Sequence, residues 1–202
     1  MLQPSSMLSR LDMETRAHHR EVDAYWLDLM AVGVTRDQYK AHLVRTYGFE
    51  APLESALAYT PQLVIADRRD RVRSGLIAQD LLALGITPAK VTALPQCRDI
   101  EPFENPAEAL GWKYVIERPT QMHAAIKRNL INHVGELANA CAYLSVCDGI
   151  AGARWQQFGS LLDDVAEDHQ RASTSMIEGA HRAFSCMIGW FRRSGQLAAV
   201  AP

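Results

Sequence analysis

The chain has 202 residues, with 48% apolar and 22% charged side chains and a formal charge of −2, which is ordinary for one globular domain with a substantial core. So nearly balanced a charge argues against a nucleic-acid partner, because general nucleic-acid binders are basic. No uncharged apolar run approaches the roughly 18 residues of a membrane helix, and the N-terminal residues lack the basic start and apolar core of a secretory signal. We therefore expect a cytoplasmic protein with no membrane partner.

A helical pattern begins close to the N-terminus. From Leu8 to Leu29, residues suited to one buried face recur at steps of three and four, which predicts one long amphipathic helix. Ser5, Ser6 or Ser9 is expected to cap its first turn, because a serine hydroxyl accepts a hydrogen bond from a free backbone amide there.

Two more helices are predicted in the next part of the chain. Thr35 with Gln38 three residues later is the pattern of a capping box, which starts a helix. Pro52 is expected to bend or break that helix, because proline has no N–H and clashes with the preceding turn. A third helix is predicted to end at Gly85. The proline-containing stretch 86–104 then predicts a long irregular connection.

The second half opens with a strong start signal. Asn105 is expected to cap a helix whose first residue is Pro106. Pro119 should interrupt that helix, and the helical pattern then resumes to Gly135. Further helices are predicted near residues 137–147, 151–166 and 171–193, the last of them stopped by Gly195.

These elements predict an all-α fold, because no segment has the pattern of a strand. The stretch 86–104 is also compatible with a domain boundary. However, neither half alone supplies a complete helical bundle, so we predict a single-domain bundle over residues 1–202.

The four cysteines carry no recognisable motif. Cys97, Cys141, Cys147 and Cys186 form no C-x-x-C pair, and their spacing predicts neither zinc binding nor a disulfide framework. We expect buried or inert thiols in a reducing cytoplasm.

Two adjacent histidines, His18 and His19, lie on the first predicted helix. On spacing alone, one packs in the core and the other is solvated. Asp23 follows His19 by four residues and shares its helix face. A metal-binding imidazole needs an acceptor on its other ring nitrogen, and a carboxylate one turn away meets that need. His19 with Asp23 is therefore a candidate metal-binding pair.

The same residues carry a family resemblance. The stretch Leu11–His19 resembles the N-terminal motif L-[RK]-x-x-T-x-x-x-H of heme oxygenases, and Leu110–Glu117 resembles the start of the distal motif L-G-x-x-Y-V-x-E-G-S-x-x-G-G of the bacteriophytochrome-associated branch. Three further stretches agree with the family in order, namely Tyr39–Leu43 with Tyr47 and Pro52–Glu54, Arg154–Phe158, and Ala183–Phe184. The resemblance spans about residues 8–193.

The resemblance implies an all-α domain that holds heme between a proximal and a distal helix. It implies cleavage of heme to biliverdin, carbon monoxide and iron, with oxygen and an electron donor. His19 would be the proximal iron ligand and Asp23 its carboxylate neighbour. The expected heme-contacting residues, besides His19, are Arg16, Tyr114, Glu117, His123, Lys127 and Arg128.

Two departures from the family pattern weaken that expectation. Asp12 stands where the family has a basic residue that holds a heme propionate. The candidate substitutes are Arg16, Arg10 and Arg20 nearby and Lys127 and Arg128 on the distal side. Each of them is equally well interpreted as an ordinary solvated helix charge. After Glu117 the expected G-S-x-x-G-G is replaced by the run Arg118–His123. Those glycines permit close approach of the distal backbone to heme. His123 would then be either a sixth iron ligand or a plug in the pocket, or a solvent-facing residue on an ordinary helix.

Alternative functions therefore stay open. The first is an oxygenase with an altered distal wall. The second is a non-catalytic relative that binds heme, possibly through His19 and His123, or has lost heme. A thiaminase-like enzyme is a third and would need a reactive cysteine. The basic run Arg68–Arg73 is either a docking site for an acidic partner or a solvated helix face. The electron donor and the oligomeric state are not indicated by the residues.

Overall fold

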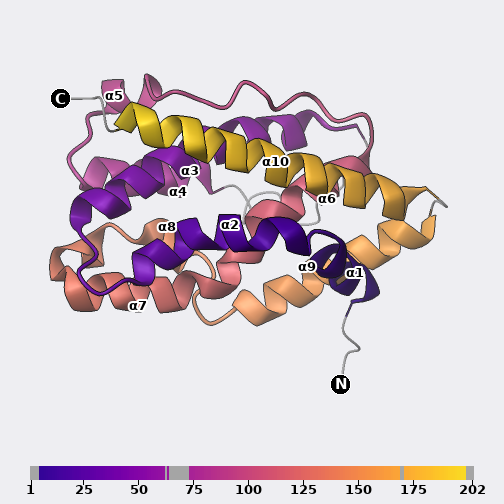
Figure 1. The fold of residues 1–202 in the computed structure, drawn as a ribbon, viewed down its shortest axis with the longest axis horizontal. Helices are drawn as coiled ribbons and strands as arrows, with labels where there is room; N and C mark the ends of the chain where they lie inside the picture. Colours follow the sequence, from indigo (N-terminus) through magenta and orange to yellow (C-terminus); the bar gives the residue numbers. More distant parts are fainter. Residues whose placement is uncertain (1–4, 62, 64–72, 169–170, 199–202) are drawn as a thin grey trace.

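The computed structural model describes residues 5–61, 63, 73–168 and 171–198 (Figure 1). Within these ranges there is no strand, which confirms the all-α prediction. The elements are α1 (Ser6–Glu14), α2 (Arg16–Leu27), η1 (Asp28–Met30), α3 (Arg36–Tyr59), α4 (Ser74–Ala83), α5 (Pro88–Thr92), α6 (Pro106–Glu117), η3 (Arg118–Met122), α7 (His123–His133), η4 (Gly135–Asn139), α8 (Ala142–Ser145), α9 (Ala151–Asp168) and α10 (Ala172–Ala198).

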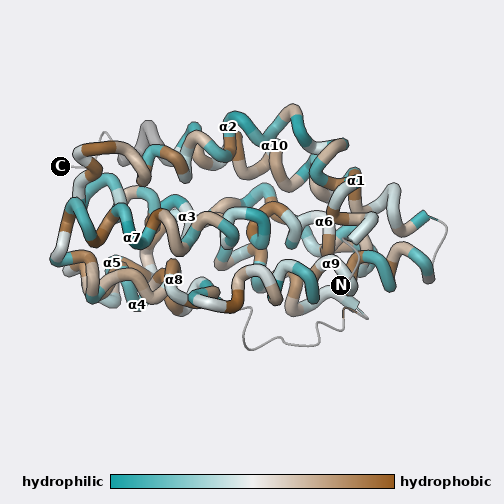
Figure 2. The backbone as a smooth tube through the Cα atoms, turned by 90° about the horizontal axis from the view of Figure 1, so that it is seen from below, coloured by the Kyte–Doolittle hydropathy of each residue, from teal (hydrophilic) through white to brown (hydrophobic). Residues whose placement is uncertain are grey.

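Helix α6 is the centre of the bundle. Every residue from Ala107 to Glu117 is buried, and α10 packs against α6 while it runs along most of the molecule (Figure 1). The two helices approach closely at Gly111 because glycine has no side chain. A Cβ there would lie only 2.1 Å from the Met176 carbonyl oxygen. Along the outer helices, hydrophobic and hydrophilic residues alternate as in amphipathic helices (Figure 2).

The prediction of one long N-terminal helix is wrong, because the helix is interrupted at Thr15. Ser5 caps α1 through the Leu8 amide, and α2 begins at Arg16. The Thr15 hydroxyl donates a hydrogen bond of 2.7 Å to the Leu11 carbonyl. A threonine side chain that bonds its own backbone in this way competes with regular helix geometry.

Helix α3 begins with the predicted capping box of Thr35 and Gln38. The expected break at Pro52 is wrong, since α3 continues to Tyr59. Pro52 has no N–H to offer the carbonyl one turn back. That carbonyl, of Gly48, instead accepts a hydrogen bond of 2.7 Å from the Cys97 amide. The loop that contains Cys97 thus supplies the hydrogen bond that Pro52 cannot donate.

The other cap and break predictions have mixed outcomes. The residue after α4, Gly85, has a positive φ of 87°, as expected for a helix stop, and Asn105 caps α6 through the Glu108 amide. Pro119 interrupts the helix as predicted, because residues Arg118–Met122 form a 3₁₀ turn. The stretch 86–104 is not wholly irregular, since it contains α5. Gly195 does not stop α10, because a glycine is tolerated inside a helix.

Candidate functional site

The candidate iron ligand, His19, lies in the first turns of α2 and is buried. Its Nε2 lies 3.0 Å from the Thr15 hydroxyl, and its ring packs against Phe184 of α10. Burial, and next the nearby Arg118 cation, lower the pKa of His19, while Asp12 acts in the opposite sense. The imidazole is therefore neutral near pH 7, which is the form that binds metals. His18 is instead partly exposed and contacts His181 at 3.1 Å.

The carboxylate beside His19 is not the one that the sequence predicts. Asp23 forms a two-point ion pair with the guanidinium of Arg118, in which Nη2 lies 3.0 Å from Oδ2. The carboxylate near His19 Nδ1 belongs to Asp12, at 3.7 Å. Asp12 also lies 3.9 Å from Arg118 Nε. Although Asp23 shares a helix face with His19, the arginine of η3 engages both its oxygens.

Two predicted site residues, Tyr114 and Glu117, are fully inside the protein. The Tyr114 hydroxyl lies beside Thr15 without a well-aligned hydrogen bond, and burial raises the pKa of Tyr114 to about 12. Glu117 is buried and lies 3.9 Å from the Lys113 ammonium. These neighbours place Tyr114 near His19 and tie Glu117 to its own helix.

Further along α2, the interior is closely packed. A cavity too narrow for a water molecule lies between α2, α3, α6, η3 and α10. Its lining residues are Trp26, Thr46, Phe49, Glu50, Ile116, Pro119, Met187 and Phe191. The gap between α2 and η3 is thus bridged by Arg118 beside His19 and filled by side chains beyond it.

His123 begins α7, directly after the 3₁₀ turn, and is fully buried. The solvent-facing alternative is therefore wrong. Its ring centroid lies 4.9 Å from that of Tyr143 and 5.3 Å from that of Trp26. Neither of its ring nitrogens has a hydrogen-bond partner among the described residues. The His19 ring contacts Thr15 and Phe184, so none of the ring contacts of the described residues joins the two histidines.

The predicted propionate-binding residues are not assembled around His19. Arg16 is exposed, and so is Arg128 on α7. Lys127 forms an ion pair of 2.5 Å with Asp148. Each of the three has a position typical of a solvated helix charge.

A buried ionic cluster was not predicted from the sequence. Arg73 is fully buried, with Nε 3.4 Å from Glu50 Oε2 and Nη2 donating to the Ile116 carbonyl at 2.9 Å. The Tyr143 hydroxyl donates to Glu50 Oε1 at 2.6 Å. Arg73 is the last residue of the basic run that starts at Arg68; residues 68–72 lie outside the described residues. For Arg73, the expectation of a solvated or docking charge is wrong.

The sequence matches one family over nearly the whole chain. The sequence model of the heme oxygenase family matches residues 5–193. The chain belongs to the heme oxygenase family. No match was found among curated proteins. Heme is the substrate of the heme oxygenase family, whose helical fold this chain shares. Within the described residues, no helix is long and apolar enough to cross a membrane.

Heme would be expected between α2 and the segment formed by α6 and η3, and the side chains there fit it on one side only. On the proximal side, His19 is neutral, the form that binds metals, and the Asp12 carboxylate lies 3.7 Å from Nδ1, beyond hydrogen-bond distance. On the distal side, a heme oxygenase would present glycine backbone. This chain instead presents Arg118, which crosses to Asp23. The residues therefore do not fit heme in this arrangement.

Proposed function

We propose that this chain is a non-catalytic member of the heme oxygenase family, in which the oxygenase reaction has been lost at the distal side. The observation that carries the proposal is the ion pair between Arg118 and Asp23. It occupies the space between α2 and η3 that a flat porphyrin would need.

The ion pair is sheltered enough to persist. The side chains of Arg118 and Asp23 are only 21% and 24% exposed. A two-point pairing of guanidinium and carboxylate is geometrically specific and stronger than a single contact. Asp12 adds a second negative charge at 3.9 Å. Heme entry would require Arg118 to leave both carboxylates, which would stay beside the porphyrin as unpaired negative charges.

Pro119 supports the same conclusion. Residues Arg118–Met122 form a 3₁₀ turn in which Pro119 and Thr120 are buried. Proline fixes φ and adds a ring where the family pattern has serine. The distal backbone is therefore both bulkier and less adaptable than a glycine-rich segment.

The second candidate is the family reaction, cleavage of heme to biliverdin, carbon monoxide and iron. The observation that favours it is His19, which is a neutral, buried imidazole beside a carboxylate. This reading requires that the Arg118 side chain swing out and that the Thr15 contact with His19 Nε2 be released. An electron donor would then also be needed.

A turnover assay separates the two candidates. The purified chain is mixed with hemin, oxygen and a reducing system of ferredoxin and its reductase, and bilin absorption and carbon monoxide are followed. We expect no biliverdin from the wild type. Biliverdin at more than one equivalent from the wild type would contradict the proposal.

Two variants test the assigned cause. Arg118→Gly with Pro119→Ser restores the Gly-Ser pair that follows the glutamate of the family's distal motif, and we expect it to gain a measurable bilin product. The matched control is Arg128→Gly, which removes an exposed arginine from α7. A gain in the control as large as in the test variant would show that Arg118 is not the specific obstacle.

A further inference from the structure

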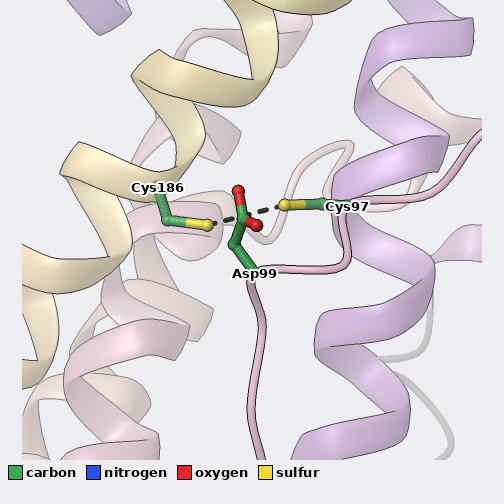
Figure 3. Close-up of side chains that lie close together, drawn as sticks. All are labelled: Cys97, Asp99 and Cys186. Atoms are coloured by element: carbon green, nitrogen blue, oxygen red, sulfur yellow. Dashed lines mark hydrogen bonds between the residues drawn. The ribbon is translucent and has the colours of Figure 1, made fainter.

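A second group of reactive side chains lies away from the family's heme position. Cys97 and Asp99 come from the loop between α5 and α6, and Cys186 comes from the middle of α10 (Figure 3). The two sulfur atoms are 3.5 Å apart. These sulfurs and a carboxylate oxygen of Asp99 all lie within 4.8 Å of one another.

Each of the three side chains is held in place by the surrounding structure. The Cys97 amide donates to the Gly48 carbonyl that Pro52 leaves free. Asp99 Oδ2 accepts a hydrogen bond of 2.5 Å from Arg193, which lies on α10 as Cys186 does. The loop is therefore attached to α3 and α10 before any ligand binds.

We propose that Cys97, Asp99 and Cys186 form a binding site for one divalent metal ion of the zinc class. Thiolates at about 2.3 Å from a tetrahedral zinc ion lie about 3.8 Å from each other. The observed separation of 3.5 Å is close to that edge. A disulfide would place the sulfurs at about 2.05 Å, so the two cysteines are reduced thiols in contact.

The charges of the three side chains agree with this assignment. Two thiolates and the Asp99 carboxylate carry three negative charges, which a divalent ion and the Arg193 guanidinium would together neutralise. Metal binding would displace the thiol protons of both cysteines.

The site is accessible from solvent. Cys97 is buried, but Asp99 is exposed and Cys186 is partly exposed. Asp99 and Cys186 line a cavity of about 440 Å³ that Trp112, His181 and Arg182 also border. Three protein ligands leave one tetrahedral position, which a water molecule from this cavity would fill.

A titration of the reduced full-length chain tests the site. Co²⁺ is added first, because it gives a near-ultraviolet charge-transfer band when bound by thiolates, and Zn²⁺ is then added to displace it. We expect one equivalent of Co²⁺ with that band, and its loss on addition of Zn²⁺. In Cys97→Ser and Cys186→Ser the band should disappear. In Cys141→Ser, whose hydroxyl can keep the bond to the Leu137 carbonyl, it should remain.

Asp99→Asn keeps the test decisive if the cysteine variants do not fold. Asp99 is exposed, so this variant should melt as the wild type does, yet bind Zn²⁺ at least about tenfold more weakly. The absence of metal binding by the reduced wild type would overturn the proposal, as would a band that persists in both cysteine variants. Reduced protein that binds no metal but forms a Cys97–Cys186 disulfide on oxidation would likewise overturn it and would identify a redox pair.

Discussion

The guanidinium of Arg118 and the carboxylate of Asp23 face each other in a two-point ion pair that joins η3 to α2. The two residues are 95 positions apart in the chain. Asp23 is therefore not free to orient His19, and the Arg118 side chain crosses from η3 to α2.

The contact between α6 and α10 should tolerate no extra carbon at Gly111. A Cβ there would lie 2.1 Å from the Met176 carbonyl oxygen and 2.8 Å from the Ala180 nitrogen, so the helices would have to separate. We expect Gly111→Ala to lower the free energy of unfolding by about 2–3 kcal/mol. Urea denaturation followed by circular dichroism measures this.

The matched control for Gly111→Ala is Gly152→Ala. Gly152 lies in α9 with nothing within 4 Å of an added Cβ. We expect this variant to be more stable than the wild type by about 0.5 kcal/mol, because alanine has less freedom in the unfolded chain. Equal effects at the two glycines would show that the α6–α10 contact is not sterically limiting.

The buried pair of Arg73 and Glu50 should be sensitive to loss of one partner. Arg73→Met leaves an unpaired carboxylate in the core, which should lower the free energy of unfolding by about 3–5 kcal/mol. The double variant Arg73→Met with Glu50→Gln should recover part of that loss. As a control, Arg192→Met breaks the exposed pair with Glu21 and should change little. If the double variant is no more stable than Arg73→Met, the unpaired charge is not the cause.

Burial of His42 should lower the stability of the folded protein as the pH falls below about 6.5. Burial, and next Arg45, lower the pKa of His42 to about 3 in the folded protein. Between that pKa and the ordinary value near 6.5, the unfolded chain binds a proton that the folded chain does not. Protonation therefore favours unfolding, by about 2 kcal/mol at pH 5. Denaturation at pH 7 and pH 5 measures the difference.

Comparison with His42→Phe isolates this contribution, because Glu50 acts in the opposite sense. Burial raises the pKa of Glu50 to about 7, so its protonation stabilises the folded state as the pH falls from 7 to 4.5. His42→Phe should lose less stability than the wild type between pH 7 and pH 5. His133→Phe, at an exposed position, should behave as the wild type does. An unchanged pH dependence in His42→Phe would contradict the assignment.

The sequence predicted the features that depend on neighbouring residues. The caps at Thr35 and Asn105 and the break at Pro119 act on hydrogen bonds within one turn, so their patterns were sufficient. Pro52 was misjudged because the donor that compensates it, the Cys97 amide, comes from a distant loop.

The candidate site was less predictable for the same reason. The spacing of His19 and Asp23 correctly places them on one helix but does not reveal the Arg118 side chain that engages Asp23. Likewise, no short-range pattern joins Cys97 to Cys186, which are 89 positions apart. A chemical group whose partner is distant in the chain leaves no local signal in a single sequence.

The most direct test of the Arg118 obstacle is an absorption titration of hemin into the wild type, Arg118→Gly, and Arg118→Gly with His19→Ala. We expect Arg118→Gly to bind hemin at least about tenfold more tightly than the wild type, because the distal obstacle and its ion pair are removed. The added His19→Ala should abolish that gain. Wild-type protein that binds hemin as tightly as Arg118→Gly, through His19, would contradict the account.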